Sequence, residues 1–131
     1  MKTFSITKKE RLKSQKAIGK LFKQKRSAGA FPLRFFYMER TLEEQSVPVQ
    51  VSFSVSKKHF KKAVERNRLK RLIREAYRLD KQRFLLFLTE KEIRIAGMWV
   101  FVGTELCSFS DMQKAMRKSI DRLILELGVT K

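Results

Sequence analysis

The chain has few of the residues that build disulfides, metal sites and acidic active sites. Its 131 residues include one cysteine, one histidine and 13 acids. Cys107 cannot form an internal disulfide, and a zinc site is excluded because no paired Cys or His lies near it. We therefore expect Cys107 to be a small packing residue. His59 lies among lysines without an evident nucleophile, which favours an exposed position over work as a general base.

Clustered acids and nucleotide-binding loops are also missing. Glu43 with Glu44 and Glu90 with Glu92 fall in expected loops, so no carboxylate cluster for two-metal hydrolysis is visible. Neither a P-loop nor a Rossmann glycine pattern occurs. We expect no catalytic residue, no metal site and no nucleotide cofactor in the chain, which leaves a binding protein.

Long hydrophobic runs are absent as well. No stretch approaches the ~18 apolar residues that cross a membrane. The N-terminus lacks the apolar segment of a signal peptide, because Lys8, Lys9, Arg11 and Lys13 come early. These absences predict a cytoplasmic protein without a membrane partner.

Positive charge is what the chain has in excess. Its 31 Lys and Arg residues give a formal net charge of +18, which points to a polyanion such as RNA, DNA or an anionic surface. Eleven Phe and 43% hydrophobic residues argue for a folded protein and against a disordered basic tail. The length predicts a single domain over residues 1–131, with a basic segment at about residues 1–15.

The stretch from Lys57 to Arg78 concentrates this charge on a predicted helix, which should begin near Lys61, without a strong N-cap, and reach about Leu79. Its apolar stripe is Leu69, Leu72, Ile73 and Ala76, and its opposite side carries Asn67, Lys70, Arg71, Arg74 and Arg78. Ten Lys or Arg stand against two acids here, whereas a merely solvated face usually mixes both signs. The imbalance favours an anionic ligand, with nucleic acid as the first candidate.

Two alternating stretches predict strands in the first half of the chain. Residues 49–56 have Val or Phe at every second position, and residues 31–38 are rich in aromatic side chains, with Pro32 at the start. The polar residues 40–48 between them are expected to form a hairpin loop. Residues 16–24 predict a short helix, and residues 27–30 a loop.

Three apolar side chains in this half suit either a core or a ligand. Ile18 and Phe22 are four residues apart and would share one helix face, while Phe36 alternates with Phe35 along its strand. Aromatic rings beside basic residues such as Arg34 can stack on unpaired bases. Core packing and a partly exposed contact surface both remain open for Ile18, Phe22 and Phe36.

The second half predicts one central strand and a final helix. In residues 80–92, the apolar run at residues 84–88 could extend the basic helix or start a strand, and we favour a helix that ends before Thr89. Residues 93–102 are apolar on both faces, as in a covered central strand, and Gly97 suggests a bulge. Residues 110–113 fit a capping box, and the following helix should end before Gly128. Its apolar stripe is Met112, Met116, Ile120, Leu123 and Leu127. The resulting order of elements indicates an α+β fold with helices packed over a small sheet.

Two sequence runs resemble the signature of a known family. They are S-V-S-K-K at residues 54–58 and K-A-V-E-R-N-R-L-K-R-L-I-R-E-A at residues 62–76, with Arg66, Asn67 and Arg68 as the core. Together with the early Arg11 and Leu12, they resemble the bacterial ribonuclease P protein component. The resemblance follows the family's order over nearly the whole chain and is strong from about residue 51 to residue 78.

The resemblance implies an accessory subunit of an endoribonuclease. In that family a catalytic RNA holds the magnesium ions and removes the 5′ leader from precursor tRNA, and the protein binds both RNAs. The positions that match contacts to the catalytic RNA are Lys57, Lys58, Arg66, Asn67, Arg68, Lys70, Arg71 and Arg74. Those that match the leader-binding cleft are Ile18, Phe22 and Phe36, with Arg34 on the same strand face. Ile18 stands where the family often has an aromatic residue.

The resemblance also implies a mixed sheet of about four strands, with a left-handed strand-helix-strand crossover through the basic helix. Two other functions compete with it. A ribosomal or RNA-chaperone-like protein without processing activity would use the same charge and rings. A protein that hydrolyses RNA by itself is disfavoured by the missing acid cluster.

Overall fold

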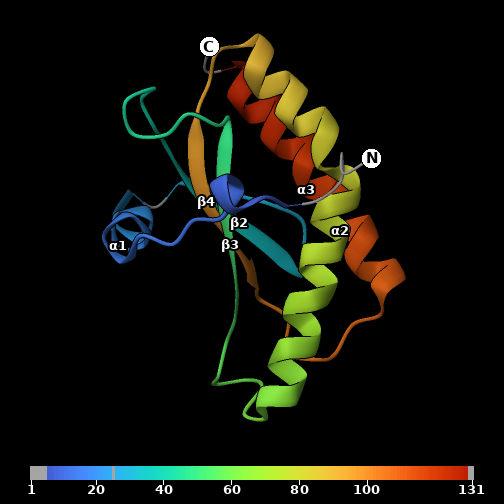
Figure 1. Cartoon of the computed structure of the whole chain (residues 1–131). Coiled ribbons are helices and arrows are strands. Elements are labelled where there is room, and N and C mark those ends of the chain that lie inside the picture. The colour runs from blue at the N-terminus through green and yellow to red at the C-terminus, as the bar shows by residue number, and fades with distance from the viewer. Residues whose placement is uncertain (1–5, 25, 130–131) are drawn as a thin grey trace.

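The computed structural model describes residues 6–24 and 26–129, and in it a four-stranded sheet lies between one short helix and two long ones (Figure 1). In chain order the elements are η1 (Lys8–Glu10), α1 (Gln15–Gln24), β1 (Ser27–Ala28), β2 (Leu33–Glu39), β3 (Val49–Val55), α2 (Ala63–Glu90), β4 (Ile95–Phe101) and α3 (Phe109–Val129). The predicted α+β class and the six predicted elements are confirmed. The loop expected over residues 27–30 instead begins with β1, which pairs with β2 through Ser27 and Phe36.

The strand order β1-β2-β4-β3 corrects the predicted hairpin. β4 is antiparallel to β2 and parallel to β3, so it lies between the two strands expected to be neighbours. Residues 40–48 run past the end of β4, where Arg40 N–H donates to Arg94 O at 2.7 Å and Ile95 N–H donates to Pro48 O at 2.9 Å. β4 takes the centre because it is apolar on both faces, as the sequence predicts. The handedness of the β3-α2-β4 crossover stays a prediction.

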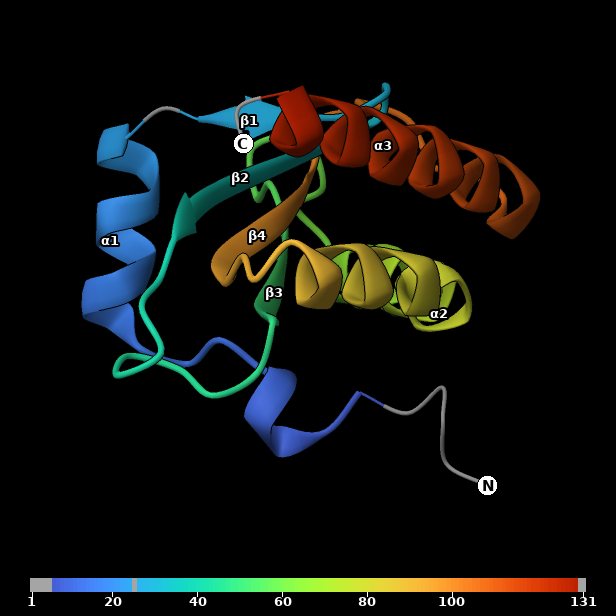
Figure 2. The same ribbon diagram turned by 90° about the horizontal axis from the view of Figure 1, so that it is seen from above.

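The two faces of the sheet are covered unequally. Figure 2 shows α1 on one side and both long helices on the other. The face below α2 and α3 is the main core, with Phe35, Tyr37 and Trp99 fully buried. On the α1 side, a smaller cluster packs Leu21 of α1 against Met38 of β2. Because α1 is only ten residues long, part of this second face stays accessible.

Helix α2 extends well beyond the basic stretch, as favoured for residues 84–88, but it ends at Glu90 and not before Thr89 as predicted. Phe84 and Leu88 continue the buried stripe of Leu69 and Ile73, so the apolar face that holds the helix to the core runs from Leu69 to Leu88. Lys62 occupies the N-cap position without a side-chain hydrogen bond, which confirms the expected weak start.

Three further local predictions are wrong, one in β4 and two at the ends of α3. β4 pairs in continuous register through Gly97, so no bulge forms; instead a Cβ atom there would lie 2.1 Å from Cζ of Phe35, whose ring requires the space. Helix α3 is capped two residues earlier than expected, because Ser108 Oγ accepts from Asp111 N–H at 3.1 Å. The helix also continues past Gly128 to Val129.

Candidate nucleic-acid interface

The basic face of α2 is exposed in the structure as the helical projection predicts. Leu69 and Ile73 are fully buried, while Arg68, Arg71 and Arg74 are exposed. Asn67 is exposed and Lys70 is partly buried on the same helix, and Lys57 and Lys58 are exposed in the turn before it. We call this set the helix surface: Lys57, Lys58, Asn67, Arg68, Lys70, Arg71 and Arg74. One helix thus buries its apolar stripe and presents cations to solvent.

Arg66 departs from the rest of the predicted set. Its Nη1 donates to the carbonyl oxygens of Phe60 and Lys61, at 2.8 and 2.9 Å. Phe60 is buried against Phe101, with ring centroids 5.8 Å apart. Arg66 therefore holds the turn that presents Lys57 and Lys58, a role that the charge pattern alone does not reveal.

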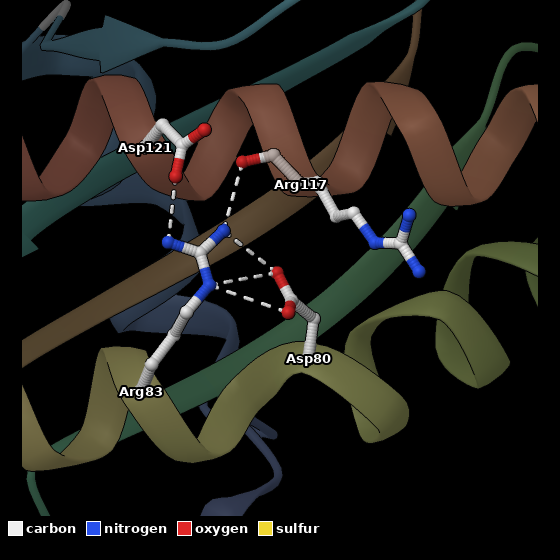
Figure 3. Close-up of polar contacts among 4 residues, drawn as sticks. All are labelled: Asp80, Arg83, Arg117 and Asp121. Atoms are coloured by element: carbon white, nitrogen blue, oxygen red, sulfur yellow. Dashed lines mark hydrogen bonds and ion pairs between the residues drawn. The ribbon is translucent and has the colours of Figure 1, made fainter.

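Further along α2, two arginines are already paired with acids. Arg78 Nε donates to Glu75 at 3.1 Å, and this hydrogen bond lowers the pKa of the Glu75 carboxyl. Arg83 Nη2 donates to Asp80 and to the carbonyl of Arg117, and its Nη1 donates to Asp121 of α3 at 2.6 Å (Figure 3). Arg78 is thus paired within α2, and Arg83 is paired both within α2 and with α3. The helix surface consequently ends near Arg74.

A second group of cations lies where the N-terminal segment passes the edge of β3. Arg11 and Lys13 line a cavity of about 500 Å³ together with Lys70 and Arg74 of α2. The Arg74 guanidinium lies 5.6 Å from the ring centre of Phe53. We call this cavity the edge groove, lined by Ile6, Arg11, Leu12, Lys13, Val51, Ser52, Phe53, Lys70 and Arg74. Sequence reasoning placed none of Arg11, Lys13 or Phe53 in a site, because the three meet only through tertiary structure.

A buried ion pair holds this segment in place. Lys81 Nζ of α2 lies 2.9 and 3.0 Å from the two carboxylate oxygens of Glu10, and the Lys81 residue is only 2% exposed. Glu10 Oε1 also accepts from Thr7 N–H at 2.8 Å. Next to it, Leu12 N–H donates to Val51 O at 2.8 Å. The segment is therefore fixed both to α2 and to the edge of β3, and Figure 1 shows it crossing from the α2 side of the sheet to α1.

The predicted cleft residues gather on the other face of the sheet. Phe22 of α1 and Phe36 of β2 have ring centroids 5.3 Å apart, and Phe22 is 45% exposed. Ile18 is partly buried one turn earlier and packs against the small cluster below α1. Arg34 is exposed two residues before Phe36 on the same strand face, and its Nε donates to Ser27 Oγ at 3.0 Å. We call Ile18, Phe22, Arg34 and Phe36 the sheet surface.

Neither surface contains a recognisable metal centre. Across residues 6–24 and 26–129, no three His, Cys, Asp or Glu side chains lie close enough together to hold a metal ion. His59 is exposed. In the same part of the chain, no helix is long and apolar enough to cross a membrane. The described residues thus offer cations and aromatic rings, which are the groups that contact phosphates and unpaired bases.

Comparison with known proteins identifies the family. A family model described as Ribonuclease P matches residues 6–124. The Ribonuclease P protein component of Porphyromonas gingivalis is 37% identical over 121 residues, covering 92% of this chain and 88% of that protein. The component from Chlorobium phaeobacteroides is 40% identical over 96 residues, covering 72% and 66%.

A solved structure shows that the fold is shared as well. The Staphylococcus aureus RNase P protein superposes with a TM-score of 0.68 at 19% identity, covering 87% of this chain and 94% of that one. The family model and the relatives confirm the resemblance that the sequence runs at residues 54–58 and 62–76 indicated. The chain therefore belongs to the ribonuclease P protein component family.

Proposed function

We propose that this chain acts as the protein subunit of ribonuclease P and holds two RNAs on two different surfaces. The helix surface binds the catalytic RNA, and the sheet surface binds the single-stranded 5′ leader of precursor tRNA. The observation that carries this proposal is the chemical difference between the surfaces. One presents cations along a helix, and the other presents the paired rings of Phe22 and Phe36.

The helix surface suits a structured RNA because cationic side chains are the groups that bind phosphate. Lys57, Lys58, Arg68 and Arg71 are exposed, and they lie on a turn and a helix that pack against the core through Phe60, Leu69 and Ile73. Contacts of this kind set affinity and orientation on a folded RNA and carry little base specificity. Arg66 serves the same interface indirectly, because it holds the turn that carries the two lysines.

The sheet surface suits an unpaired strand because rings stack on bases of any sequence. Phe22 and Phe36 offer such rings, and Arg34 lies on the same face of β2 for a neighbouring phosphate. The edge groove extends the cations of the helix surface to the edge of β3, where Arg11 and Lys13 line it together with Lys70 and Arg74.

In this proposal hydrolysis belongs to the RNA subunit. Magnesium ions held by that RNA would activate the attacking water and stabilise the leaving oxygen. The protein contributes by binding the leader and the catalytic RNA together, so that the cleavage site is oriented before reaction. It also neutralises phosphate charge where the two RNAs approach each other.

The test is stimulation of a bacterial ribonuclease P RNA at low magnesium concentration. Adding the purified chain should accelerate leader removal from precursor tRNA, and the chain without the RNA should cleave nothing. Absence of stimulation would favour the ribosomal or chaperone-like alternative, whereas cleavage without the RNA would favour a self-sufficient nuclease. For variants that remove a cation from the helix surface, Lys91→Ala is the matched control, because Lys91 is an exposed lysine outside that surface.

A further inference from the structure

A pocket on the α3 side of the molecule contains no residue of either proposed RNA surface. It lies between the start of β2, the loop from β4 to α3, and the first turns of α3. Its volume is about 390 Å³, and it is lined by Phe31, Pro32, Phe101, Gly103, Thr104, Glu105, Leu106, Cys107, Asp111, Lys114, Ala115 and Lys118. We call it the loop pocket.

An exposed aromatic ring forms one wall of the loop pocket. Phe31 is 77% exposed, although Phe35 and Tyr37, which follow it in the same segment, are fully buried. Leu106 on the facing loop is 49% exposed, and Phe101 is buried in the floor. A cavity with one apolar wall and an uncovered ring suits a flat ligand that can stack.

Charges of both signs surround this wall. Lys114 and Lys118 lie one turn apart on α3 and are exposed, as are Glu105 and Asp111. Among the ion pairs formed by the described residues, none involves these four side chains. A purely anionic ligand such as free phosphate would meet the two carboxylates. A nucleotide fits better, because it combines an anionic phosphate with a base that donates hydrogen bonds.

We propose that the loop pocket binds one unpaired nucleotide of RNA, with its base stacked on Phe31 and its phosphate beside Lys114 and Lys118. In this arrangement Glu105 accepts hydrogen bonds from the Watson–Crick edge of the base. Guanine presents two adjacent donors there, N1–H and the N2 amino group, whereas uracil presents one N–H between two carbonyl oxygens. The pocket therefore prefers guanine and disfavours uracil.

This site deepens the proposed function, since it assumes that the chain's partner is RNA. It adds a third contact on the face of the sheet opposite Phe22 and Phe36. A nucleotide extruded from a structured RNA and a nucleotide of the leader share the same chemistry. To separate the two sources, the alkylation rate of Cys107 in the pocket is measured in the holoenzyme with precursor tRNA and with leaderless tRNA. Protection that is lost with the leaderless substrate assigns the nucleotide to the leader, and protection that remains assigns it to the structured RNA.

Cys107 provides a direct reporter because it is the only cysteine in the chain and it lines the loop pocket. Burial raises the pKa of its thiol, so alkylation is best followed at mildly alkaline pH. The experiment measures the rate of Cys107 alkylation by iodoacetamide in the isolated chain, with and without short RNAs. The RNAs are a pentauridine and the same oligonucleotide with guanosine at its centre, with inorganic phosphate as a further control.

We expect the guanosine oligonucleotide to slow alkylation at concentrations where pentauridine and phosphate do not. Phe31→Ala should weaken this protection about fivefold or more, the factor for one lost base–aromatic stack. Glu105→Gln should reduce the difference between the two oligonucleotides. Leu86→Ala is the matched control and should leave protection unchanged, because Leu86 is an exposed apolar residue of α2 that lines neither the loop pocket nor either proposed RNA surface.

Equal alkylation rates with and without the guanosine oligonucleotide would overturn the proposal, as would unchanged protection in Phe31→Ala. Each rate is compared with that of the same variant without RNA, so a change in thiol exposure cannot imitate binding. The isolated chain is tested without catalytic RNA. Failure of this site and failure of the proposed ribonuclease P function are therefore separate results.

Discussion

The helix surface and the sheet surface differ in how the fold builds them. The helix surface comes mainly from one continuous segment, whose 3.6-residue period places Arg68 and Arg71 on the side opposite Leu69. The sheet surface needs α1 and β2 to meet, so that Phe22 reaches Phe36. A surface carried by one helix is preserved as long as the helix forms, whereas a surface made by two elements also depends on what holds them together. The Glu10–Lys81 ion pair is one such contact, because it fixes the segment that leads into α1 to helix α2.

The largest effect on stability is expected from breaking the Glu10–Lys81 ion pair. Lys81→Ala would leave the Glu10 carboxylate buried without its partner, and the free energy of unfolding should fall by about 3–5 kcal/mol. Urea denaturation measures this loss. The double variant Glu10→Gln with Lys81→Met removes both charges and should recover much of it. A single variant no less stable than the surface control Lys91→Ala would contradict the structural role.

Removing the rings should separate the two surfaces by function. Phe22→Ala is expected to weaken holoenzyme binding of precursor tRNA by about 1–3 kcal/mol through the loss of one base stack. Binding of leaderless tRNA and of the catalytic RNA should not change. Equilibrium binding with the two substrates makes the measurement. An equal loss for both substrates would remove Phe22 from the leader site.

Removing cations should give the opposite pattern. Arg68→Ala together with Arg71→Ala should weaken binding of the catalytic RNA and flatten its dependence on salt by about 0.7–0.9 log units per lost phosphate contact. A salt titration of the binding constant provides the slope. Lys91→Ala, which removes an exposed charge elsewhere, should leave the slope unchanged. An unaltered slope in the double variant would place both arginines outside the interface.

The smallest effect is expected for Tyr37, which is buried in the main core on the face of the sheet opposite Phe36. Burial and the hydrogen bond to Glu126 raise the pKa of Tyr37 to about 12, so the neutral phenol is favoured in the folded state. Its stabilising contribution is complete below pH 10 and should be lost as pH rises from about 10 to about 12. Tyr37→Phe should lack this part of the alkaline decline. Denaturant titrations of both proteins at several pH values test the difference, and identical pH profiles would count against it.

Sequence reasoning succeeded where one element was sufficient. The extension of α2 beyond the basic stretch was favoured by the apolar run at residues 84–88, and the central place of β4 followed from its two apolar faces. It failed where two elements compete for the same place. The hairpin between β2 and β3 was wrong because β4 enters between them, and no local pattern in residues 40–48 records that.

Charge shows the same division at the level of single side chains. Arg66 and Arg78 looked like further cations of the basic helix, but the first holds a turn and the second is paired with Glu75. Beyond them, Arg83 is paired with Asp80. Composition counts every arginine alike. Which guanidinium remains available depends on the carbonyls and carboxylates that the fold brings within about 3 Å of it.

By itself, the sequence determined that this protein is basic and folded, with an exposed cationic face on α2, because charge and helical period are local properties. Only the tertiary structure decided that Arg11 lies beside Lys70, that Glu10 is buried with Lys81, and that Phe31 stands outside the core. The physical reason is that these contacts join segments far apart in the chain. Their formation depends on competition among all the strands and helices for one core, and no single segment encodes its outcome.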